Sequence, residues 1–223
     1  MRVPTPNGNY MSWYVDNDLS PNDSIGIDEV GRGPLAGPVV AVAVWICEDF
    51  VLELEKNVVA LPVRDSKKMT KNQRQKITSW IKKQPSDCVK YAIASATVEE
   101  IDTLNILQAA LLSMERAYNA LGVSGKTVLV DGNAAPPIKN TSLRTVVQGD
   151  SKVLSIALAS VIAKEHRDEY MRELSHEYPH YSWEKNVGYG MAVHLQAIRQ
   201  WGITPHHRKT FAPMKKESMI ELY

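Results

Sequence analysis

Two apolar segments near the start of the chain constrain its fold most strongly. Residues 24–30 (SIGIDEV) and 39–47 (VVAVAVWIC) are rich in β-branched residues, which favours two buried strands. The loop between them, residues 31–38 (GRGPLAGP), holds three glycines and two prolines and ends the first strand. We therefore expect a core built on a β-sheet.

The rest of the chain alternates between strand and helix patterns. Further strands are predicted at residues 89–95, 127–131 and 143–148, and helices at residues 70–83, 97–121, 151–177 and 190–201. This order predicts an α/β protein: a sheet flanked by helices, with a helical C-terminal extension. We expect a flexible lead-in over residues 1–23, a main domain over residues 24–178 and a basic extension over residues 179–223 that packs on it.

The charge of the chain is small but unevenly distributed. The 26 Lys and Arg residues and 25 Asp and Glu residues give a net charge of +1, which argues against a histone-like polycation. Residues 1–55 hold two basic and nine acidic residues, a net −7, so the remaining residues carry +8. A cationic second half favours a polyanionic partner.

Other features place the chain among cytoplasmic proteins. The sequence has neither a signal peptide nor an apolar stretch long enough to span a membrane, so we expect a soluble, cytoplasmic protein. Two cysteines do not make a disulfide framework or a zinc site. Cys47 and Cys88 each lie in an apolar run, and we expect both to be buried thiols.

Four acidic residues stand out by their surroundings. Asp28 and Glu29 lie inside a strand pattern, Asp131 ends another, and Asp150 stands between a strand and a long apolar helix. Such positions can converge at one edge of a sheet. Carboxylates without His or Cys suit Mg²⁺ or Mn²⁺, and two such cations can activate water and stabilise the leaving oxygen of a phosphodiester.

Structural alternatives exist for these features. Asp150 is also a candidate N-cap for the helix that follows, and Asp131 with Gly132 fits a turn. The loop over residues 31–38 matches neither a phosphate-binding P-loop nor a dinucleotide fingerprint. It is either an ordinary tight connection or a loop that brings bare backbone close to a ligand.

Residues 27–40 (IDEVGRGPLAGPVV) resemble the signature of the ribonuclease HII family, the bacterial-type type 2 ribonucleases H. Further blocks follow in the family's order: residues 65–67 (DSK), 130–132 (VDG), 149–152 (GDSK), 159–164 (ASVIAK) with Arg167 and Asp168, 188–190 (GYG) ahead of His194, and 205–211 (PHHRKTF). The resemblance implies an RNase H-like mixed sheet flanked by helices, with the catalytic domain over residues 24–178.

The resemblance also implies an activity. Such an enzyme hydrolyses the RNA strand of RNA–DNA hybrids and cuts 5′ of single ribonucleotides in duplex DNA by a two-metal mechanism. The cut leaves 3′-hydroxyl and 5′-phosphate ends, and it serves ribonucleotide removal from DNA and RNA primer removal. The catalytic residues, which would also ligate two Mg²⁺ or Mn²⁺ ions, map onto Asp28, Glu29, Asp131 and Asp150.

Substrate contacts carry over in the same way. Backbone groups of the Gly-Arg-Gly motif would read the ribose 2′-hydroxyl, a tyrosine would pack on the next deoxyribose, and a Ser-Lys pair would contact phosphate. These roles fall on Gly31, Arg32, Gly33, Tyr189, Ser66 and Lys67. Basic residues of the second half are expected to add phosphate contacts: Lys152, Lys164, Arg167, Lys185, Arg208 and Lys209.

Two alternatives to this function are open. A ribonuclease HIII-like enzyme would cut hybrids only, and a catalytically silent module would only bind nucleic acid, although the complete carboxylate set argues against the latter. His194 and His207 are possible general acids, but structural roles are favoured for both. We expect a monomer that acts on RNA–DNA hybrids and ribonucleotide-containing DNA, and see no sliding-clamp motif.

Overall fold

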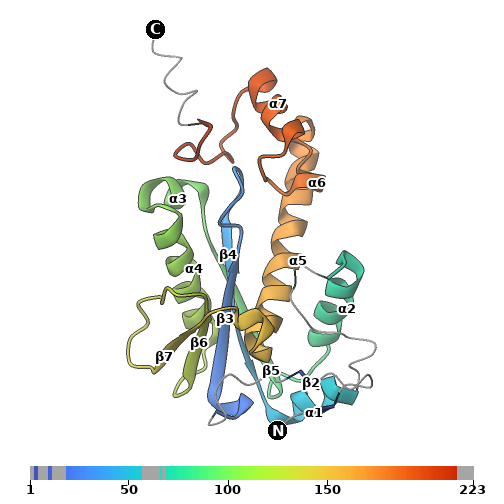
Figure 1. Cartoon of the computed structure of the whole chain (residues 1–223), viewed down its shortest axis with the longest axis vertical. Helices are drawn as coiled ribbons and strands as arrows, with labels where there is room; N and C mark the ends of the chain where they lie inside the picture. The colour runs from blue at the N-terminus through green and yellow to red at the C-terminus, as the bar shows by residue number, and fades with distance from the viewer. Residues whose placement is uncertain (1–2, 5–9, 12–18, 57–65, 67–68, 215–223) are drawn as a thin grey trace.

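The central feature of the fold is a five-stranded mixed sheet in the order β5-β4-β3-β6-β7 (Figure 1). The structure is a computed structural model that describes residues 3–4, 10–11, 19–56, 66 and 69–214. The strands are β3 (Ser24–Val30), β4 (Val39–Ile46), β5 (Val89–Ala96), β6 (Thr127–Asp131) and β7 (Leu143–Val146). The pairs β3–β4 and β4–β5 are antiparallel, whereas β3–β6 and β6–β7 are parallel. The predicted α/β mixed sheet is confirmed.

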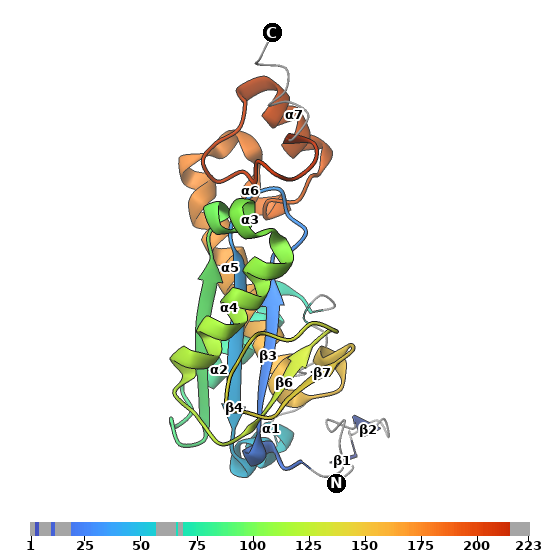
Figure 2. The same cartoon turned by 90° about the vertical axis from the view of Figure 1, so that its left-hand side faces the viewer.

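Helices cover both faces of this sheet (Figure 2). The long helices are α2 (Lys71–Ile81), α4 (Ile106–Leu121) and α5 (Leu154–Glu177). Side chains alternate along β4: Ala41 and Ala43 belong to the core that contains α4, whereas Val42 and Val44 pack with α2 and α5. At Gly26 of β3, a Cβ atom would lie 2.4 Å from the backbone nitrogen of Ile156, so only glycine allows α5 to approach this closely.

The remaining elements are short. They are β1 (Val3–Pro4), which pairs with β2 (Tyr10–Met11), η1 (Pro21–Asp23), α1 (Glu48–Lys56), α3 (Val98–Leu104), η3 (Gly149–Ser151), η4 (Pro179–Tyr181), α6 (Trp183–Asn186) and α7 (Ala192–Trp201). The sequence did not predict α1 or α6. In the described part of the chain, no helix is both long and apolar enough to cross a membrane.

The single helix predicted over residues 97–121 is wrong, because the chain breaks at Asn105. Thr97 begins α3 with the expected capping box. Asn105 then takes a positive φ of 73°, and its side chain accepts hydrogen bonds from the amides of Leu107 and Gln108 at 3.0 and 3.2 Å. Asn105 therefore ends α3 and caps α4, and the apolar stripe continues across the break.

The C-terminal elements meet the loop over residues 31–38 at one end of the sheet (Figures 1 and 2). Leu35 and Ala36 of this loop pack in one apolar cluster with Met171, Trp183 and Ile198. The backbone joins the two segments as well, because Leu35 O accepts a hydrogen bond from the Arg208 amide at 2.9 Å. The C-terminal elements thus form the wall against which this loop is held.

The two cysteines are not buried thiols, so that prediction is wrong. Cys47 follows β4 and Cys88 precedes β5, and both are partly exposed because they lie just beyond the paired strands. A hydrogen bond joins their sulfur atoms at 3.0 Å and raises the pKa of Cys88 to about 11.

Candidate active site

Two of the predicted carboxylates lie at the same level on neighbouring strands. The parallel register pairs Ile27 of β3 with Val130 of β6, which places Asp28 beside Asp131. Ile27 and Val130 both face α4, so Asp28 and Asp131 point to the opposite face, where α5 packs. Glu29 follows at the end of β3. The sheet thereby brings three carboxylates to one edge.

Asp28 is the most buried of these groups, with 6% of its surface exposed. Its carboxylate accepts hydrogen bonds from the Glu29 amide at 2.7 Å and from the Ser160 side chain of α5. Burial, with repulsion from Glu29 and Asp131, raises the pKa of Asp28 well above its ordinary value. The fold therefore holds a carboxylate where its negative charge is costly.

Glu29 shares this environment. Burial raises its pKa, while the Arg32 guanidinium, with Nη1 3.2 Å from Glu29 Oε1, acts in the opposite direction. Half of the Arg32 side chain is exposed, so water screens this ion pair. Arg32 therefore offsets only part of the negative charge at this edge of the sheet.

Asp150 is placed beside Asp131 by a backbone contact. The amide of Gly149 donates a hydrogen bond to Asp131 Oδ1 at 2.6 Å, and Asp150 is the next residue in the short helix η3. The alternative role of Asp150 as helix cap is wrong, because Val153 is the N-cap residue of α5. The four predicted catalytic residues thus come from three neighbouring elements.

The chemistry of these side chains fits a hard divalent cation. All are carboxylates, which Mg²⁺ and Mn²⁺ prefer, and a cation would relieve their mutual repulsion. Within the described residues, no three His, Cys, Asp or Glu side chains already surround a single metal position.

Arg208 holds the glycine-rich loop from the inside. Its side chain is fully buried, and Nη2 donates to Gly31 O at 2.5 Å and Nη1 to Arg32 O at 3.0 Å. The same guanidinium also donates to Pro34 O at 2.8 Å and to Gly37 O at 2.8 and 3.0 Å. Burial lowers the pKa of Arg208 to about 9, so it keeps its charge at neutral pH. Four backbone carbonyl groups therefore accept hydrogen bonds from the one buried guanidinium group of Arg208.

This arrangement turns two amide groups outward. The C=O and N–H bonds of a trans peptide point in opposite directions. Because the carbonyls of Gly31 and Arg32 point inward to Arg208, the N–H groups of Arg32 and Gly33 point away from it. Arg32 and Gly33 are exposed, and no described group accepts a hydrogen bond from either amide. The loop thus offers two donors next to Glu29.

Tyr189 lies on the other side of Gly33. A Cβ atom on Gly33 would lie 3.3 Å from Cε1 of the Tyr189 ring, so ring and backbone are in contact. The Tyr189 side chain is 43% exposed. The exposed amides, the tyrosine ring and the carboxylates therefore form one continuous surface.

Arg167 is a second buried arginine at this loop. It donates to Ala36 O at 2.9 Å, to Pro38 O at 3.0 Å and to Val187 O at 2.9 Å. The prediction that Arg167 and Arg208 contact phosphate is wrong, because both side chains point into the protein and bind backbone carbonyls. The remaining predicted phosphate contacts are at least partly accessible: Lys152, Lys164, Lys185 and Lys209.

Gly31 cannot carry a side chain in this arrangement. Its φ is +95°, and a Cβ would lie 2.3 Å from Arg167 Nε and 2.8 Å from Pro38 O. We expect Gly31→Ala to lower cleavage per folded molecule by about tenfold or more, because the loop must move to relieve the clash. Gly125→Ala is the control: Gly125 has a φ of +71° but no atom within 4 Å of its Cβ position, so it carries strain without a clash. Wild-type activity in Gly31→Ala would show that this loop is only a connection.

Ser66 supports Asp28 indirectly. It is 3% exposed, and its hydroxyl shares a 2.8 Å hydrogen bond with Ser160, whose side chain also hydrogen-bonds to Asp28. The Ser66 hydroxyl therefore faces the protein interior and not a phosphate, contrary to the predicted substrate contact. Lys67 lies outside the described residues.

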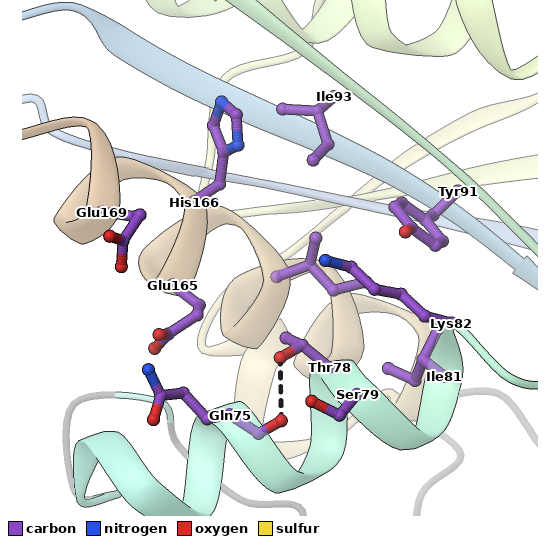
Figure 3. Close-up of a pocket in the computed structure, with 11 residues that line it drawn as sticks. Gln75, Thr78, Ser79, Ile81, Lys82, Tyr91, Ile93, Glu165, His166 and Glu169 are labelled. Atoms are coloured by element: carbon purple, nitrogen blue, oxygen red, sulfur yellow. Dashed lines mark hydrogen bonds between the residues drawn. The ribbon is translucent and has the colours of Figure 1, made fainter. Parts of the chain in front are cut away.

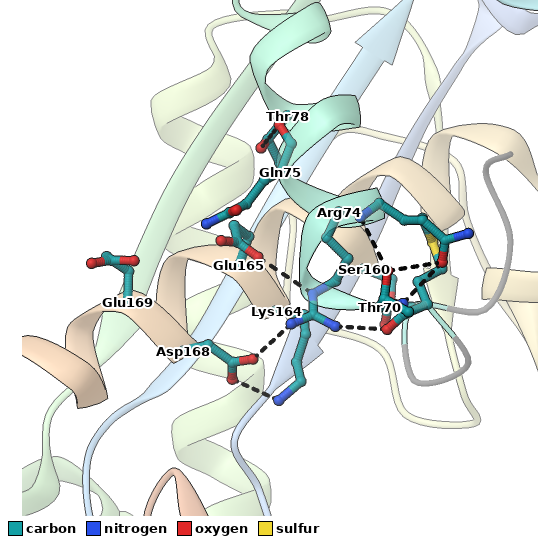
Figure 4. A network of polar contacts seen from close by, with 12 residues as sticks. Thr70, Arg74, Gln75, Thr78, Ser160, Lys164, Glu165, Asp168 and Glu169 are labelled. Carbon is teal, nitrogen blue, oxygen red and sulfur yellow. Dashed lines mark hydrogen bonds and ion pairs between the residues drawn. The ribbon is translucent and has the colours of Figure 1, made fainter. Parts of the chain in front are cut away.

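An ion-pair network ties α2 to α5 near this serine pair (Figure 4). Arg74 of α2 donates to Asp168 at 3.0 Å and lies 3.4 Å from Glu165, while Lys164 binds Asp168 at 2.6 Å. Arg74 also donates to Met69 O at 2.9 Å. The network anchors the start of α2 on α5, and Ser160 lies one turn before Lys164.

A cavity of about 430 Å³ lies between α2, β5 and α5 (Figure 3). Gln75, Lys82, Tyr91, Glu165 and His166 are among the residues that line it. None of the predicted site residues does.

Comparisons with known proteins identify the family of this chain. Residues 25–214 match the family model for ribonuclease HII. The ribonuclease HII of Wolbachia sp. subsp. Brugia malayi is 44% identical over 205 residues, which are 92% of this chain and 95% of that protein.

Solved structures give the same fold. Ribonuclease H2 from Pyrococcus horikoshii superposes with a TM-score of 0.71 at 26% identity, over 90% of this chain and 99% of that one. Bst-RNase HIII, solved in complex with Mn²⁺, superposes with a TM-score of 0.68 at 20% identity, over 92% of this chain and 72% of that one. The chain therefore belongs to the ribonuclease HII family and is a type 2 ribonuclease H, a hydrolase.

Proposed function

We propose that this enzyme hydrolyses the RNA strand of RNA–DNA hybrids and also cuts duplex DNA 5′ of a single embedded ribonucleotide, leaving 3′-hydroxyl and 5′-phosphate ends. The outward-facing amides of Arg32 and Gly33 beside the carboxylates carry this proposal. The 2′-hydroxyl distinguishes RNA from DNA at a given sugar, and it is both donor and acceptor. A backbone donor next to the reacting phosphate is therefore suited to detect it.

The tyrosine supplies the second part of the recognition. With the ribose against the loop, the next sugar of the strand would meet the Tyr189 ring, which lies against Gly33. An extra hydroxyl on that sugar would crowd the ring, so a deoxyribose fits better there. The loop and the ring together would recognise an RNA–DNA junction.

The carboxylates are placed to act on the phosphate. Asp28, Glu29, Asp131 and Asp150 would hold two divalent cations, Mg²⁺ or Mn²⁺, which supply water activation and stabilisation of the leaving oxygen when bound. The Mn²⁺ complex of Bst-RNase HIII supports a metal site on this fold. Ser160 and the Glu29 amide donate hydrogen bonds to the Asp28 carboxylate, which offset part of the cost of burying its charge and fix its orientation. The exposed lysines would follow the backbone of the duplex.

Parallel assays on two substrates test this function. A DNA duplex with one ribonucleotide and a long RNA–DNA hybrid are each incubated with Mg²⁺, with Mn²⁺ and with EDTA. We expect metal-dependent cleavage of both. Cleavage of the hybrid alone would favour the hybrid-only alternative, and binding without cleavage of either would favour the silent module.

Tyr189→Ala should separate the two substrates. Loss of the ring removes a stacking contact worth about 1 kcal/mol or more, so we expect single-ribonucleotide cleavage to fall roughly five- to tenfold further than hybrid cleavage. Met191→Ala is a suitable control, because Met191 is a neighbouring side chain that is also exposed, at 58%. Equal losses on both substrates would contradict the role of Tyr189 on the sugar.

The expected lack of a sliding-clamp motif stays a prediction. The end of the chain, residues 215–223, lies outside the described residues. The monomeric state is likewise a prediction from sequence.

A further inference from the structure

Two histidines of the C-terminal elements are fully buried and face each other. His194 of α7 and His207 have no exposed surface, and their Nε2 atoms are 3.1 Å apart. The rings of Tyr181 and Trp183 pack around them. Neither histidine faces solvent, so neither acts as a general acid, and their hydrogen bonds have to be explained in another way.

The partners of His207 define where its proton lies. Its Nδ1 accepts a hydrogen bond from the Thr204 amide at 2.9 Å, and a backbone amide is always a donor. Nδ1 therefore carries no proton. In a neutral ring the proton is then on Nε2, which faces His194 Nε2 and donates to it.

The partners of His194 define the opposite tautomer. Its Nε2 accepts from His207 and also from the indole N–H of Trp183, at 3.1 Å. Its Nδ1 lies 2.9 Å from Tyr189 O, which can only accept. The His194 proton is therefore on Nδ1. Burial lowers the pKa of both histidines, to about 4 for His207, which keeps both rings neutral.

Thr204, His207, His194 and Tyr189 thus form one directed series of hydrogen bonds, the His chain, that ends on a backbone carbonyl. That carbonyl belongs to the residue whose ring touches Gly33. The Tyr189 backbone has two other contacts: its amide donates to Asn186 O and its carbonyl accepts from the Met191 amide, both at 2.8 Å. Both of these lie within the same short turn, whose neighbouring carbonyls at Val187 and Gly188 are held by Arg167 and by the Leu35 amide. The His chain links the Tyr189 backbone itself to residue 207.

We infer that His194 and His207 are positioning residues that hold the Tyr189 ring against the Gly31–Gly33 backbone and so set the preference for a single ribonucleotide. The inference rests on the proposed role of Tyr189 in sugar recognition. His207 is next to Arg208, which holds the carbonyls of Gly31 and Arg32. His207 is thereby linked to the backbone of Tyr189, and the adjacent Arg208 to the loop over residues 31–33.

Substitution of His194 and His207 by asparagine and by glutamine tests the His chain, because each substitution keeps a different hydrogen bond at each position. The amide of Asn lies near the place of imidazole Nδ1, and that of Gln near the place of Nε2. His194→Asn keeps a donor for Tyr189 O, whereas His194→Gln loses it. His207→Gln keeps the donor toward His194, whereas His207→Asn keeps only the acceptor for Thr204.

The measured quantity is the rate on the single-ribonucleotide duplex divided by the rate on the long hybrid, for variants with matched melting temperatures. We expect this ratio to fall about fivefold in His194→Gln and His207→Asn and to stay near the wild-type value in His207→Gln. In His194→Asn, which keeps the donor to Tyr189 O but loses the hydrogen bond from His207, we expect a smaller fall than in His194→Gln. Adding Tyr189→Ala to His194→Gln should lower the ratio no further than Tyr189→Ala alone. General damage to the core cannot produce a pattern that reverses between the two positions.

Nitrogen NMR of the wild-type protein gives a readout that is independent of activity. We expect His194 to carry its proton on Nδ1 and His207 on Nε2; a proton on Nε2 of His194 would overturn the inference. A selective effect of Tyr189→Ala without one of His194→Gln would also overturn it, while leaving the proposed function intact. A wild-type enzyme that does not cut the single-ribonucleotide duplex would overturn the proposed function, and the inference with it.

Discussion

Asp28→Asn is expected to lower cleavage of both substrates by a factor of about 10³ or more, because it removes a buried charge where the cations would bind. Asparagine has nearly the same shape, and its side-chain oxygen can still accept the hydrogen bonds from Ser160 and from the Glu29 amide. The fold and duplex binding should therefore remain. Turnover near the wild-type level would remove the two-metal account.

The same substitution should make the metal-free protein more stable. Burial and repulsion from Glu29 and Asp131 disfavour the ionised form of Asp28, so a neutral side chain relieves a cost that the folded state carries. In EDTA we expect the melting temperature of Asp28→Asn to lie above that of the wild type. Added Mg²⁺ should raise the melting temperature of the wild type only.

Asp87→Asn is the control for this pair of measurements. Asp87 is exposed and lies before β5, away from the carboxylates. Its replacement should change neither cleavage nor the response to Mg²⁺. A Mg²⁺ response that persists in Asp28→Asn would show that the cation binds somewhere else.

Arg208→Met is expected to lower the free energy of unfolding by about 3 kcal/mol or more. The buried guanidinium is bound by four carbonyl groups, and each acceptor left without a donor costs about 1–3 kcal/mol. The free carbonyls of Gly31 and Arg32 can then rotate, so the amides of Arg32 and Gly33 lose their outward orientation. Urea denaturation measures the loss of stability. Cleavage per folded molecule measures the loss of the amide orientation, and we expect this rate to fall about 100-fold.

Two controls separate stability from recognition. Arg167→Met also removes a buried arginine, but it frees the carbonyls of Ala36, Pro38 and Val187. It should destabilise the protein while costing less activity per folded molecule than Arg208→Met. Lys209→Met changes the exposed neighbour of Arg208 and should leave stability unchanged. Equal activity losses in the two arginine variants would contradict a specific role of Arg208 in the loop.

The candidate carboxylate site could be proposed from sequence because strand patterns are local. Charges inside or at the end of an apolar strand are rare, and this pointed to Asp28, Glu29 and Asp131. The register of β3 and β6, which brings Asp28 and Asp131 together, is a tertiary feature. Hydrophobic periodicity does not show that Asp28 and Asp131 lie together; the resemblance to the ribonuclease HII family indicated it.

The roles of the two buried arginines were not predictable in the same way, whereas the structural roles favoured for His194 and His207 agree with their burial. Sequence shows that Arg167 and Arg208 are charged, but their partners are backbone carbonyls, all but that of Val187 more than 100 residues away along the chain. Backbone groups leave no mark in a residue pattern, so a phosphate contact was the natural interpretation. Asn105 is similar: the apolar stripe runs through it, and only the ability of asparagine to adopt a positive φ and to cap a helix signals the break.

The proposed recognition surface, formed by the 31–33 loop, Tyr189 and the carboxylates, would detect a single 2′-hydroxyl in duplex DNA. The most direct test is a gel assay on an end-labelled DNA duplex with one ribonucleotide, beside the same duplex with deoxyribose at that position, in Mg²⁺, Mn²⁺ and EDTA. We predict one metal-dependent cut on the 5′ side of the ribonucleotide and none in the all-DNA duplex. Cleavage of both duplexes, or of neither while a long RNA–DNA hybrid is cut, would contradict it.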